Sequence, residues 1–542
     1  MPHMGIDSIK YTVNNILSKR KERRRSSFGE MPDLHYFDGD MRGIRTYYDY
    51  RCDNKLDDFL IDDITWKDLS MDDVFKRINQ GRCTSGEQYL YYMLRSPAVT
   101  KAEYEKRNDF LEFTEKNADL RLKLHIILEK LGRRRSANTC EAFSPSVHSP
   151  KKLFLYILLV LCLIGTGISL VFTSAAVMPF FALIIFIPVF HQIESTRIES
   201  ELSTVNYSVA MVHALKKIKR LSSSDLDQYL SSFYDAGKRV KSISRIGGVS
   251  TSVTNDIAGL ICILTLLDLI SYELLKNRLG KHHDDIFHIH EYLGRIDAAI
   301  AIASYRKSVE VYANPQIDFS SSADVRFFAE ELTHPLINDA IPNSVDTVGP
   351  LLITGSNASG KSVFLKTVAI NTILAQSICT ALCKEYSATA FRVLSSMAIA
   401  DNLLAGESYY ISEIKSLKRI VNAANMKTPI LCVIDEVLRG TNTVERISAS
   451  SELLAEFAGG KILCFAATHD IELCSMLENR YRMFHFEETV TDIGDVLFDY
   501  RIKTGPATSR NALKLLRSIG FDDGIVDRAD EKANRYIASG KW

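Results

Sequence analysis

A glycine-rich loop that ends in lysine and serine is the feature of this sequence with the clearest chemistry. The loop reads GSNASGKS and fits the spacing G-x-x-x-x-G-K-S. In such a loop, backbone N–H groups point at phosphate oxygens, and the glycines allow an approach that a Cβ would block. The sequence therefore predicts a nucleotide phosphate site. Its predicted contacts are Gly355, Ser356, Asn357, Ala358, Ser359, Gly360, Lys361 and Ser362.

Two later motifs add the groups that nucleotide hydrolysis needs. Lys361 is expected to bind the β- and γ-phosphates, and Ser362 to bind Mg²⁺. The apolar run PILCVIDE ends in Asp435 and Glu436, which we assign to the metal and to the attacking water. The run KILCFAATHD carries His469, placed to sense the γ-phosphate. Together these motifs predict one Mg²⁺-dependent ATP hydrolysis site. GTP is disfavoured because no guanine-reading N-K-x-D motif stands in the expected place.

The elements around these motifs alternate between strand and helix. Residues 351–354 form an apolar run typical of a buried strand, and apolar residues at helical spacing follow the loop. From about 319 to 505 this alternation predicts an α/β domain. The preceding segment 283–308 instead has one apolar helical stripe. The stripe consists of Ile286, Ile289, Leu293, Ile296 and Ile300.

A long uncharged segment lies well before the α/β domain. No Asp, Glu, Lys or Arg occurs from Leu153 to Ile193, a run about twice the ~20 residues that one membrane span needs. It predicts two transmembrane helices joined by a short turn near Ser174. Basic residues before the first span place both soluble parts in the cytoplasm, which predicts a multi-pass protein of the inner or plasma membrane. The alternative is a buried helical hairpin in a soluble core.

A second apolar patch, residues 257–270, is shorter and carries Asp268. It is interpreted as a packed core helix, with a third span as the alternative. The whole chain has 542 residues and equal numbers of basic and acidic side chains, 66 each, so its net charge is uninformative about partners. The ten cysteines lack CxxC pairs, which argues against a zinc site or a disulfide framework.

The predicted division of the chain follows these composition changes. It comprises a polar, basic N-terminal segment (1–54), a helical region (55–135), a linker (136–152), the transmembrane hairpin (153–193), a returning helical region (194–318), the ATPase domain (319–505) and a C-terminal helical segment (506–542).

Four stretches of the sequence resemble the MutS family of mismatch-repair ATPases, which are related to ABC ATPases. They are TGSNASGKS, DNLLAGESYYISE, DEVLRGTNT and ATHD. The second fits the family signature D-x-x-x-x-G-x-S-x-x-x-x-E through Asp401, Gly406, Ser408 and Glu413. The resemblance implies that Ser408 reaches ATP bound by the other subunit of a homodimer. Without it, the same residues would suggest an ordinary helix start with a capping serine.

The resemblance extends beyond the ATPase. The helical segments before it resemble the core and lever helices of MutS, and the C-terminal segment resembles the helix-turn-helix through which the family dimerises. The implied fold is an ABC-like P-loop ATPase domain after a mostly helical domain that two transmembrane helices interrupt. Three departures stand out. No counterpart of the mismatch-reading domain is found, the hairpin stands near the place of the DNA clamp, and Ala340 replaces an aromatic residue that stacks on adenine in the family.

Three functions fit these features. The first is a membrane-anchored dimeric ATPase that acts on DNA, mismatched or branched. The second is a membrane-tethered, ATP-driven switch or clamp with a protein or lipid partner and no DNA binding. The third, an ABC-type transporter, is disfavoured because two spans per chain make a poor pathway. No small-molecule substrate other than ATP is inferred.

Overall fold

A computed structural model gives the positions of most of the chain. It describes residues 28–32, 34–37, 39–134, 137, 150–221, 229, 235–240, 256–320, 325–356, 359–397, 409–424, 428–438, 441–490, 496–507, 513, 516–517 and 519–539. The chain forms two compact units. The helical unit comprises residues 1–58, 78–93 and 109–308, and the sheet unit comprises 59–77, 94–108 and 309–542. Two segments of the predicted helical region 55–135 therefore cluster with the sheet unit.

The sheet unit is built on a six-stranded sheet with the order β12-β9-β4-β8-β7-β6, in which β9, β4, β8, β7 and β6 run parallel. A second sheet has the order β1-β5-β2-β3, and β10 pairs with β11. The strands are β1 (Gln316–Asp318), β2 (Phe327–Leu332), β3 (Asn343–Thr347), β4 (Leu351–Thr354), β5 (Glu385–Thr389), β6 (Arg392–Ser396), β7 (Ile430–Asp435), β8 (Ile462–Ala467), β9 (Arg482–His485), β10 (Glu488–Val490), β11 (Val496–Phe498) and β12 (Lys503–Thr504).

Helices connect and cover these strands. They are α3 (Asp63–Asp68), α16 (Lys361–Ser377), α17 (Tyr409–Ala424), α18 (Thr443–Phe457) and α19 (Glu472–Leu477), and α21 (Asp523–Ser539) follows the last strand. Strands β4, β7 and β8 are buried throughout, as expected for parallel strands covered on both faces. Helix α16 packs against β7 and β8. The sequence-based prediction of an α/β domain with a strand at 351–354 is confirmed.

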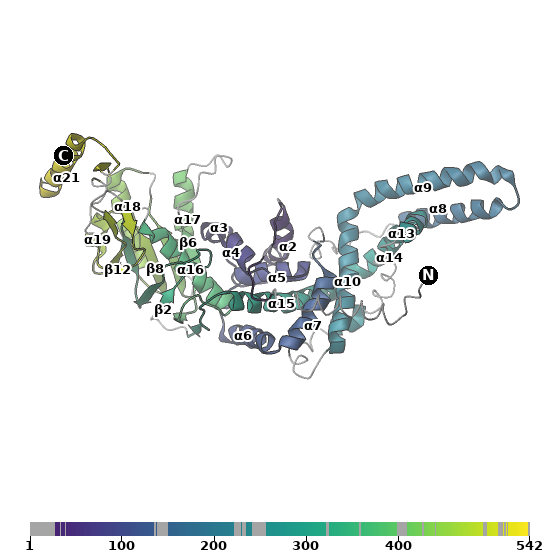
Figure 1. Cartoon of the computed structure of the whole chain (residues 1–542), viewed down its shortest axis with the longest axis horizontal. Coiled ribbons are helices and arrows are strands. Elements are labelled where there is room, and N and C mark those ends of the chain that lie inside the picture. The colour runs from purple at the N-terminus through teal and green to yellow at the C-terminus, as the bar shows by residue number, and fades with distance from the viewer. Residues whose placement is uncertain are drawn as a thin grey trace, which may run out of the picture. The chain divides into compact units, whose positions relative to one another are not determined.

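The helical unit contains long helices, whose arrangement Figure 1 shows. They are α2 (Asp40–Asp53), α7 (Ala118–Leu131), α8 (Pro150–Ser169), α9 (Val177–Arg197), α10 (Glu199–Leu221), α13 (Asp256–Leu264), α14 (Leu267–Lys281) and α15 (His283–Ser308). Helices α4 (Met71–Ile78), α5 (Thr84–Arg95) and α6 (Lys101–Lys116) begin in one unit and end in the other along the chain. All five residues of the predicted stripe on α15 are buried, which confirms that prediction.

The uncharged segment forms a helical hairpin. Helices α8 and α9 lie side by side (Figure 1), and the short 3-10 helix Ser174–Ala176 stands at the predicted turn. Among the described residues, these are the two helices long and apolar enough to cross a membrane. Only 6% of the most apolar window of α8 and 11% of that of α9 is buried. A buried hairpin in a soluble core would show the opposite, so this alternative loses its support.

The second apolar patch differs from the predicted single core helix. The chain breaks at Leu266, which has a left-handed backbone (φ 48°), so that α13 ends before it and α14 begins after it. Helix α13 packs against α9, and α14 packs against α8. Leu266 and Leu269 are buried, whereas Leu260 and Ile261 are exposed. With nine residues, α13 is too short to be the third span that the sequence left open.

Candidate nucleotide site

The phosphate loop connects β4 to α16, and two glycines shape it. Gly355 has φ 135°, and a Cβ on it would lie 2.6 Å from the carbonyl oxygen of Phe486. Gly360 has φ 106° and caps the N-terminus of α16. A Cβ there would lie 3.3 Å from the ring of Tyr500. Both positions therefore need glycine for conformation and for space, as the motif predicts.

Lys361 lies at the centre of the loop. Its side chain is only 1% exposed, and Nζ donates hydrogen bonds to the carbonyl oxygens of Gly355 and Ser356, each at 2.6 Å. The hydroxyl of Ser359 donates to the same Ser356 carbonyl at 2.7 Å. The ammonium group is thus held inside the loop, where a phosphate chain would approach it.

The structure brings three of the predicted catalytic residues together. Glu436 follows β7, and its Oε1 lies 2.8 Å from Nε2 of His469, which follows β8. The same His469 nitrogen lies 3.5 Å from Nζ of Lys361. Glu436 has a left-handed backbone (φ 58°), and its N–H donates to the Ala467 carbonyl at 2.9 Å. Three separate strand ends therefore present one lysine, one histidine and one carboxylate to the same place.

An ion pair fixes the segment that carries His469. Arg446 of α18 donates to both carboxylate oxygens of Asp470, at 3.0 and 2.7 Å. The hydrogen bond to Asp470 raises the pKa of Arg446 above its usual value. The N–H of Asp470 also donates to the Thr468 hydroxyl at 3.0 Å. Since two-point guanidinium contacts restrict orientation, this pair limits the movement of the neighbouring histidine.

Glu413 has a contact that the sequence did not predict. This buried carboxylate on α17 accepts a hydrogen bond from the backbone N–H of Leu438. Leu438 has a left-handed backbone (φ 57°), and the preceding carbonyl, of Val437, accepts from Ser450 of α18 at 3.3 Å. The last residue of the signature motif therefore holds the turn that begins with Glu436. Spacing alone could not reveal this partner.

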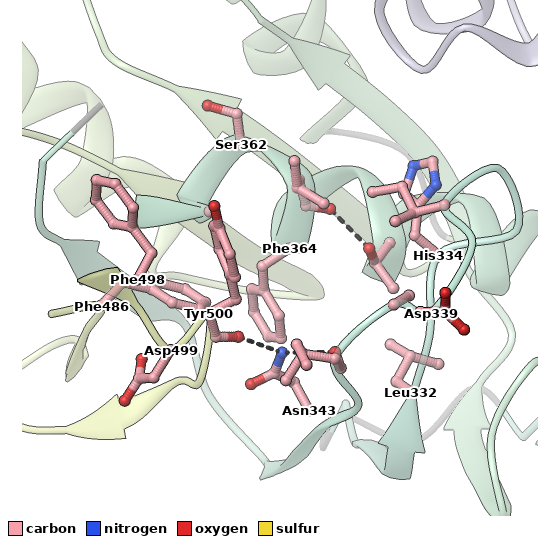
Figure 2. A pocket seen from close by; sticks show the side chains of 16 residues that line it. Leu332, His334, Asp339, Asn343, Ser362, Phe364, Phe486, Phe498, Asp499 and Tyr500 are labelled. Atoms are coloured by element: carbon pink, nitrogen blue, oxygen red, sulfur yellow. Dashed lines mark hydrogen bonds between the residues drawn. The ribbon is translucent and has the colours of Figure 1, made fainter. Parts of the chain in front are cut away.

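A cavity of about 780 Å³ opens beside the N-terminal end of α16. Figure 2 shows Tyr500 and Phe498 on one side of it, and His334 and Asp339 on the other. The lining residues are Leu332, His334, Ile337, Asp339, Ala340, Ile341, Asn343, Gly360, Ser362, Val363, Phe364, Thr367, Phe486, Phe498, Asp499 and Tyr500. A volume of this size suits a nucleotide base and its sugar.

Three of the four phenylalanine and tyrosine rings that line this cavity, those of Phe486, Phe498 and Tyr500, come from the C-terminal part of the chain, and Phe364 comes from α16. Ala340 does line the cavity, as the sequence suggested, and cannot stack. The rings of Phe498 and Tyr500 stack with centroids 5.8 Å apart. The carboxamide of Asn343 donates to the Tyr500 carbonyl at 3.0 Å and accepts from the Ile502 N–H at 2.8 Å. Asn343 thereby holds the chain at Tyr500 and just after it (Figure 2).

His334 on the opposite wall is uncharged at neutral pH. Burial, with a smaller effect from Lys366, lowers the pKa of His334 to about 4. Its Nδ1 accepts a hydrogen bond from the Leu336 N–H at 3.2 Å. A neutral His334 among apolar and aromatic lining residues suits contact with a heterocyclic base, although Asp339 and Asp499 also line the cavity.

The residues assigned to Mg²⁺ lie at the ends of two elements of the site. Ser362 is the second residue of α16 and lines the cavity, and Asp435 is the last residue of β7 and is buried. A hydroxyl and a carboxylate are the hard oxygen donors that Mg²⁺ prefers, so the donor set fits this ion. Asn357, Ala358 and Ser408 lie outside the described residues, and with them most of the signature segment.

These features are those of a P-loop ATPase domain. The phosphate loop connects a strand to a helix, an acidic residue ends a neighbouring strand, and a histidine lies beside the loop lysine. A family model described as MutS domain V matches residues 351–536. Residues 351–536 therefore form a MutS-like part of the chain.

Named relatives agree with this assignment. A DNA mismatch repair protein MutS of Nitratidesulfovibrio vulgaris (strain DP4) is 35% identical over 187 residues, covering 33% of this chain and 20% of the relative. One of Natronomonas pharaonis is 29% identical over 252 residues, covering 44% and 28%. The DNA mismatch repair protein MSH3 of Yarrowia lipolytica is 24% identical over 267 residues, covering 48% and 26%. The chain thus spans a third or less of the length of these relatives.

Proposed function

We propose that the protein is a Mg²⁺-dependent, MutS-like ATPase that a helical hairpin attaches to a membrane. The observation that carries the ATPase proposal is the convergence of Lys361, His469 and Glu436 at the phosphate loop. Lys361 binds the β- and γ-phosphates, and Glu436 orients the attacking water and accepts its proton. His469 holds the Glu436 carboxylate in place and senses the γ-phosphate.

Mg²⁺ bound by Ser362 and Asp435 would neutralise phosphate charge during hydrolysis. The base would occupy the neighbouring cavity, with Tyr500 stacking on it in place of the residue missing at Ala340. Because Tyr500 also packs over Gly360, base binding and phosphate binding share one wall.

The working unit in this proposal is a homodimer. Ser408 of each subunit would contact ATP bound by the other, as the signature motif implies. Helix N-termini favour anions, which agrees with a phosphate contact just before α17. Glu413 lies on the same helix, and its hydrogen bond to the Leu438 N–H would couple the position of that helix to the turn at Glu436.

Membrane attachment rests on the length and exposure of α8 and α9. Both helices match the ~30 Å apolar thickness of a bilayer at 1.5 Å per residue. Their large apolar side chains point outward along both helices. Soluble proteins rarely expose so large an apolar surface, because its exposure to water is unfavourable.

DNA is the proposed partner, since the named relatives are DNA mismatch repair proteins. A second candidate, an ATP-driven switch with a protein or lipid partner, is favoured by the exposed hairpin between the two helical segments. Both candidates share the ATPase and the anchor. They differ only in what the nucleotide state controls.

One assay separates the two candidates. The ATPase rate of the full chain in detergent is measured with no DNA and with duplex, mismatched or branched DNA, at low and moderate salt. Stimulation or binding that weakens as salt increases supports action on DNA, because phosphate contacts release counterions. No response to any DNA would contradict that proposal and favour the switch. Lys361→Ala, which removes the phosphate-binding ammonium group, is the control for contaminating ATPase.

A further inference from the structure

We propose that α13 and its turn into α14 form a lipid-binding element that lies on the bilayer surface beside the hairpin. This inference rests on the proposed membrane attachment and adds a second contact to it. The partner is a lipid surface, contacted by the exposed side of α13. Its first observation comes from α13 itself, and the other two come from the contacts of α13 and α14 with the hairpin.

The first observation is the exposed apolar face of α13. No charged residue occurs from Ile257 to Leu267. Leu260 and Ile261 are adjacent, and each is 55% exposed. Nine residues at 1.5 Å per residue span roughly 14 Å, about half of a bilayer core. Helix α13 can therefore lie at a membrane surface but cannot cross it.

The second observation is the position of α13 against the hairpin. Helix α13 packs on α9 and α14 packs on α8. Leu266 and Leu269 share one buried cluster with Tyr156 of α8 and Ile187 of α9. Leu266 at the turn is therefore covered by protein, whereas the outer face of α13 is left uncovered.

The exposed face of α13 continues the surface of the hairpin. The α9 residues on either side of buried Ile187 include exposed Ile185, Phe186 and Val189. Because α13 packs against this helix, Leu260 and Ile261 extend the same apolar surface away from the spans. One bilayer would cover both the hairpin and the exposed face of α13. Lipid therefore accounts for this apolar surface without a further protein partner.

The third observation is the set of polar contacts where the apolar surface ends. Asp268 at the start of α14 lies 2.8 Å from Nε2 of His191 near the end of the uncharged run. Lys152 of α8 lies 3.1 Å from Glu194 of α9. Charges at the edge of a membrane are tolerated when they are paired or reach the headgroups. These pairs mark the headgroup level, and Asp268 follows directly after the α13 turn.

The test uses spin labels on the full chain in vesicles of phosphatidylcholine and phosphatidylglycerol. Labels are placed one at a time at Ile261→Cys on α13, at native Cys162 on α8 and at Arg278→Cys on α14, with the other cysteines replaced. Cys162 and Arg278 are exposed, so all three sites accept a label. ATPase activity checks that each labelled protein is folded.

Collisions of each label with lipid-soluble oxygen and with a water-soluble nickel complex give its depth. We expect the oxygen-to-nickel ratio to be highest at 162, lowest at 278 and intermediate at 261. A ratio at 261 equal to that at 278, with 162 still in lipid, overturns the inference and leaves the proposed anchoring intact. A water-like ratio at 162 as well would contradict both. Shielding of 261 from both reagents would indicate a protein partner or a second copy, and would also overturn the inference.

Discussion

Two regions of the molecule are similarly apolar but have opposite surroundings. One is the central part of the large sheet, strands β4, β7 and β8, and the other is the hairpin of α8 and α9. In the sheet unit, Phe465 of β8 is completely buried, as are its neighbours along the strand. In the hairpin, Leu161 is 59% exposed, and most of its neighbours also face outward. Apolar composition therefore indicates that a segment is removed from water, but it does not indicate whether protein or lipid covers the segment.

Length explains the difference. Each buried strand has four to six residues and is covered by other elements of its own unit, such as α16. The two hairpin helices have 20 and 21 residues, enough for a bilayer, and the helices that pack against them leave most of their apolar side chains exposed. The polar residues differ accordingly, since the strands end in catalytic groups and the hairpin ends in ion pairs.

The largest expected effect is on the polar end of a buried strand. Glu436→Gln should lower ATP hydrolysis by roughly 10²- to 10⁴-fold, the usual contribution of a positioned general base, while ATP binding remains. Single-turnover hydrolysis and equilibrium ATP binding measure the two effects. The matched control is Glu445→Gln, at an exposed position of α18, which should leave both unchanged. A rate that falls equally in both variants would contradict the role of Glu436.

A pair of truncations tests the comparison itself. Phe465→Ala should cost about 3–5 kcal/mol of unfolding free energy, because it leaves a cavity in a closed core. Leu161→Ala should cost less than about 0.5 kcal/mol, as expected for an exposed position without special contacts. Denaturant unfolding in detergent measures both. Similar costs at the two sites would mean that the hairpin is packed inside protein.

A smaller effect is expected in the cavity beside the phosphate loop. Tyr500→Ala should weaken ATP binding by about tenfold, since an aromatic stacking contact contributes about 0.5–1.5 kcal/mol beyond buried area. Tyr500→Phe keeps the ring and serves as the control. ATP and inorganic triphosphate are compared by calorimetry. Equal weakening for both ligands would show that Tyr500 acts on the loop through Gly360 and not on the base.

The smallest expected effect concerns the turn after β7. Glu413→Gln keeps the side-chain shape and removes the charge, so the bond to the Leu438 N–H should weaken by about 1 kcal/mol. Hydrolysis should fall about fivefold, with ATP affinity unchanged. Exposed Lys418→Gln on the same helix is the control. A change in affinity without a change in rate would separate Glu413 from the Glu436 turn.

Several features followed from the sequence because they depend on local order. The two glycines of the phosphate loop, the strand before it and the stripe on α15 all appear where periodicity and spacing predicted them. The hairpin also followed, because a long uncharged run is a property of the chain itself. The break at Leu266 was not predicted, because a leucine with a left-handed backbone leaves no signal in composition.

Tertiary structure decided which distant residues meet. Only the parallel order of β4, β8 and β7 brings Lys361, His469 and Glu436 within contact distance, and only the return of the chain after β11 places Tyr500 over Gly360. Likewise, packing alone directs Glu413 to the turn at Leu438. Spacing along the chain indicates which residue types are present in a motif. Contacts between residues far apart in the sequence depend on how strands pair and helices pack, and no local sequence pattern determines this.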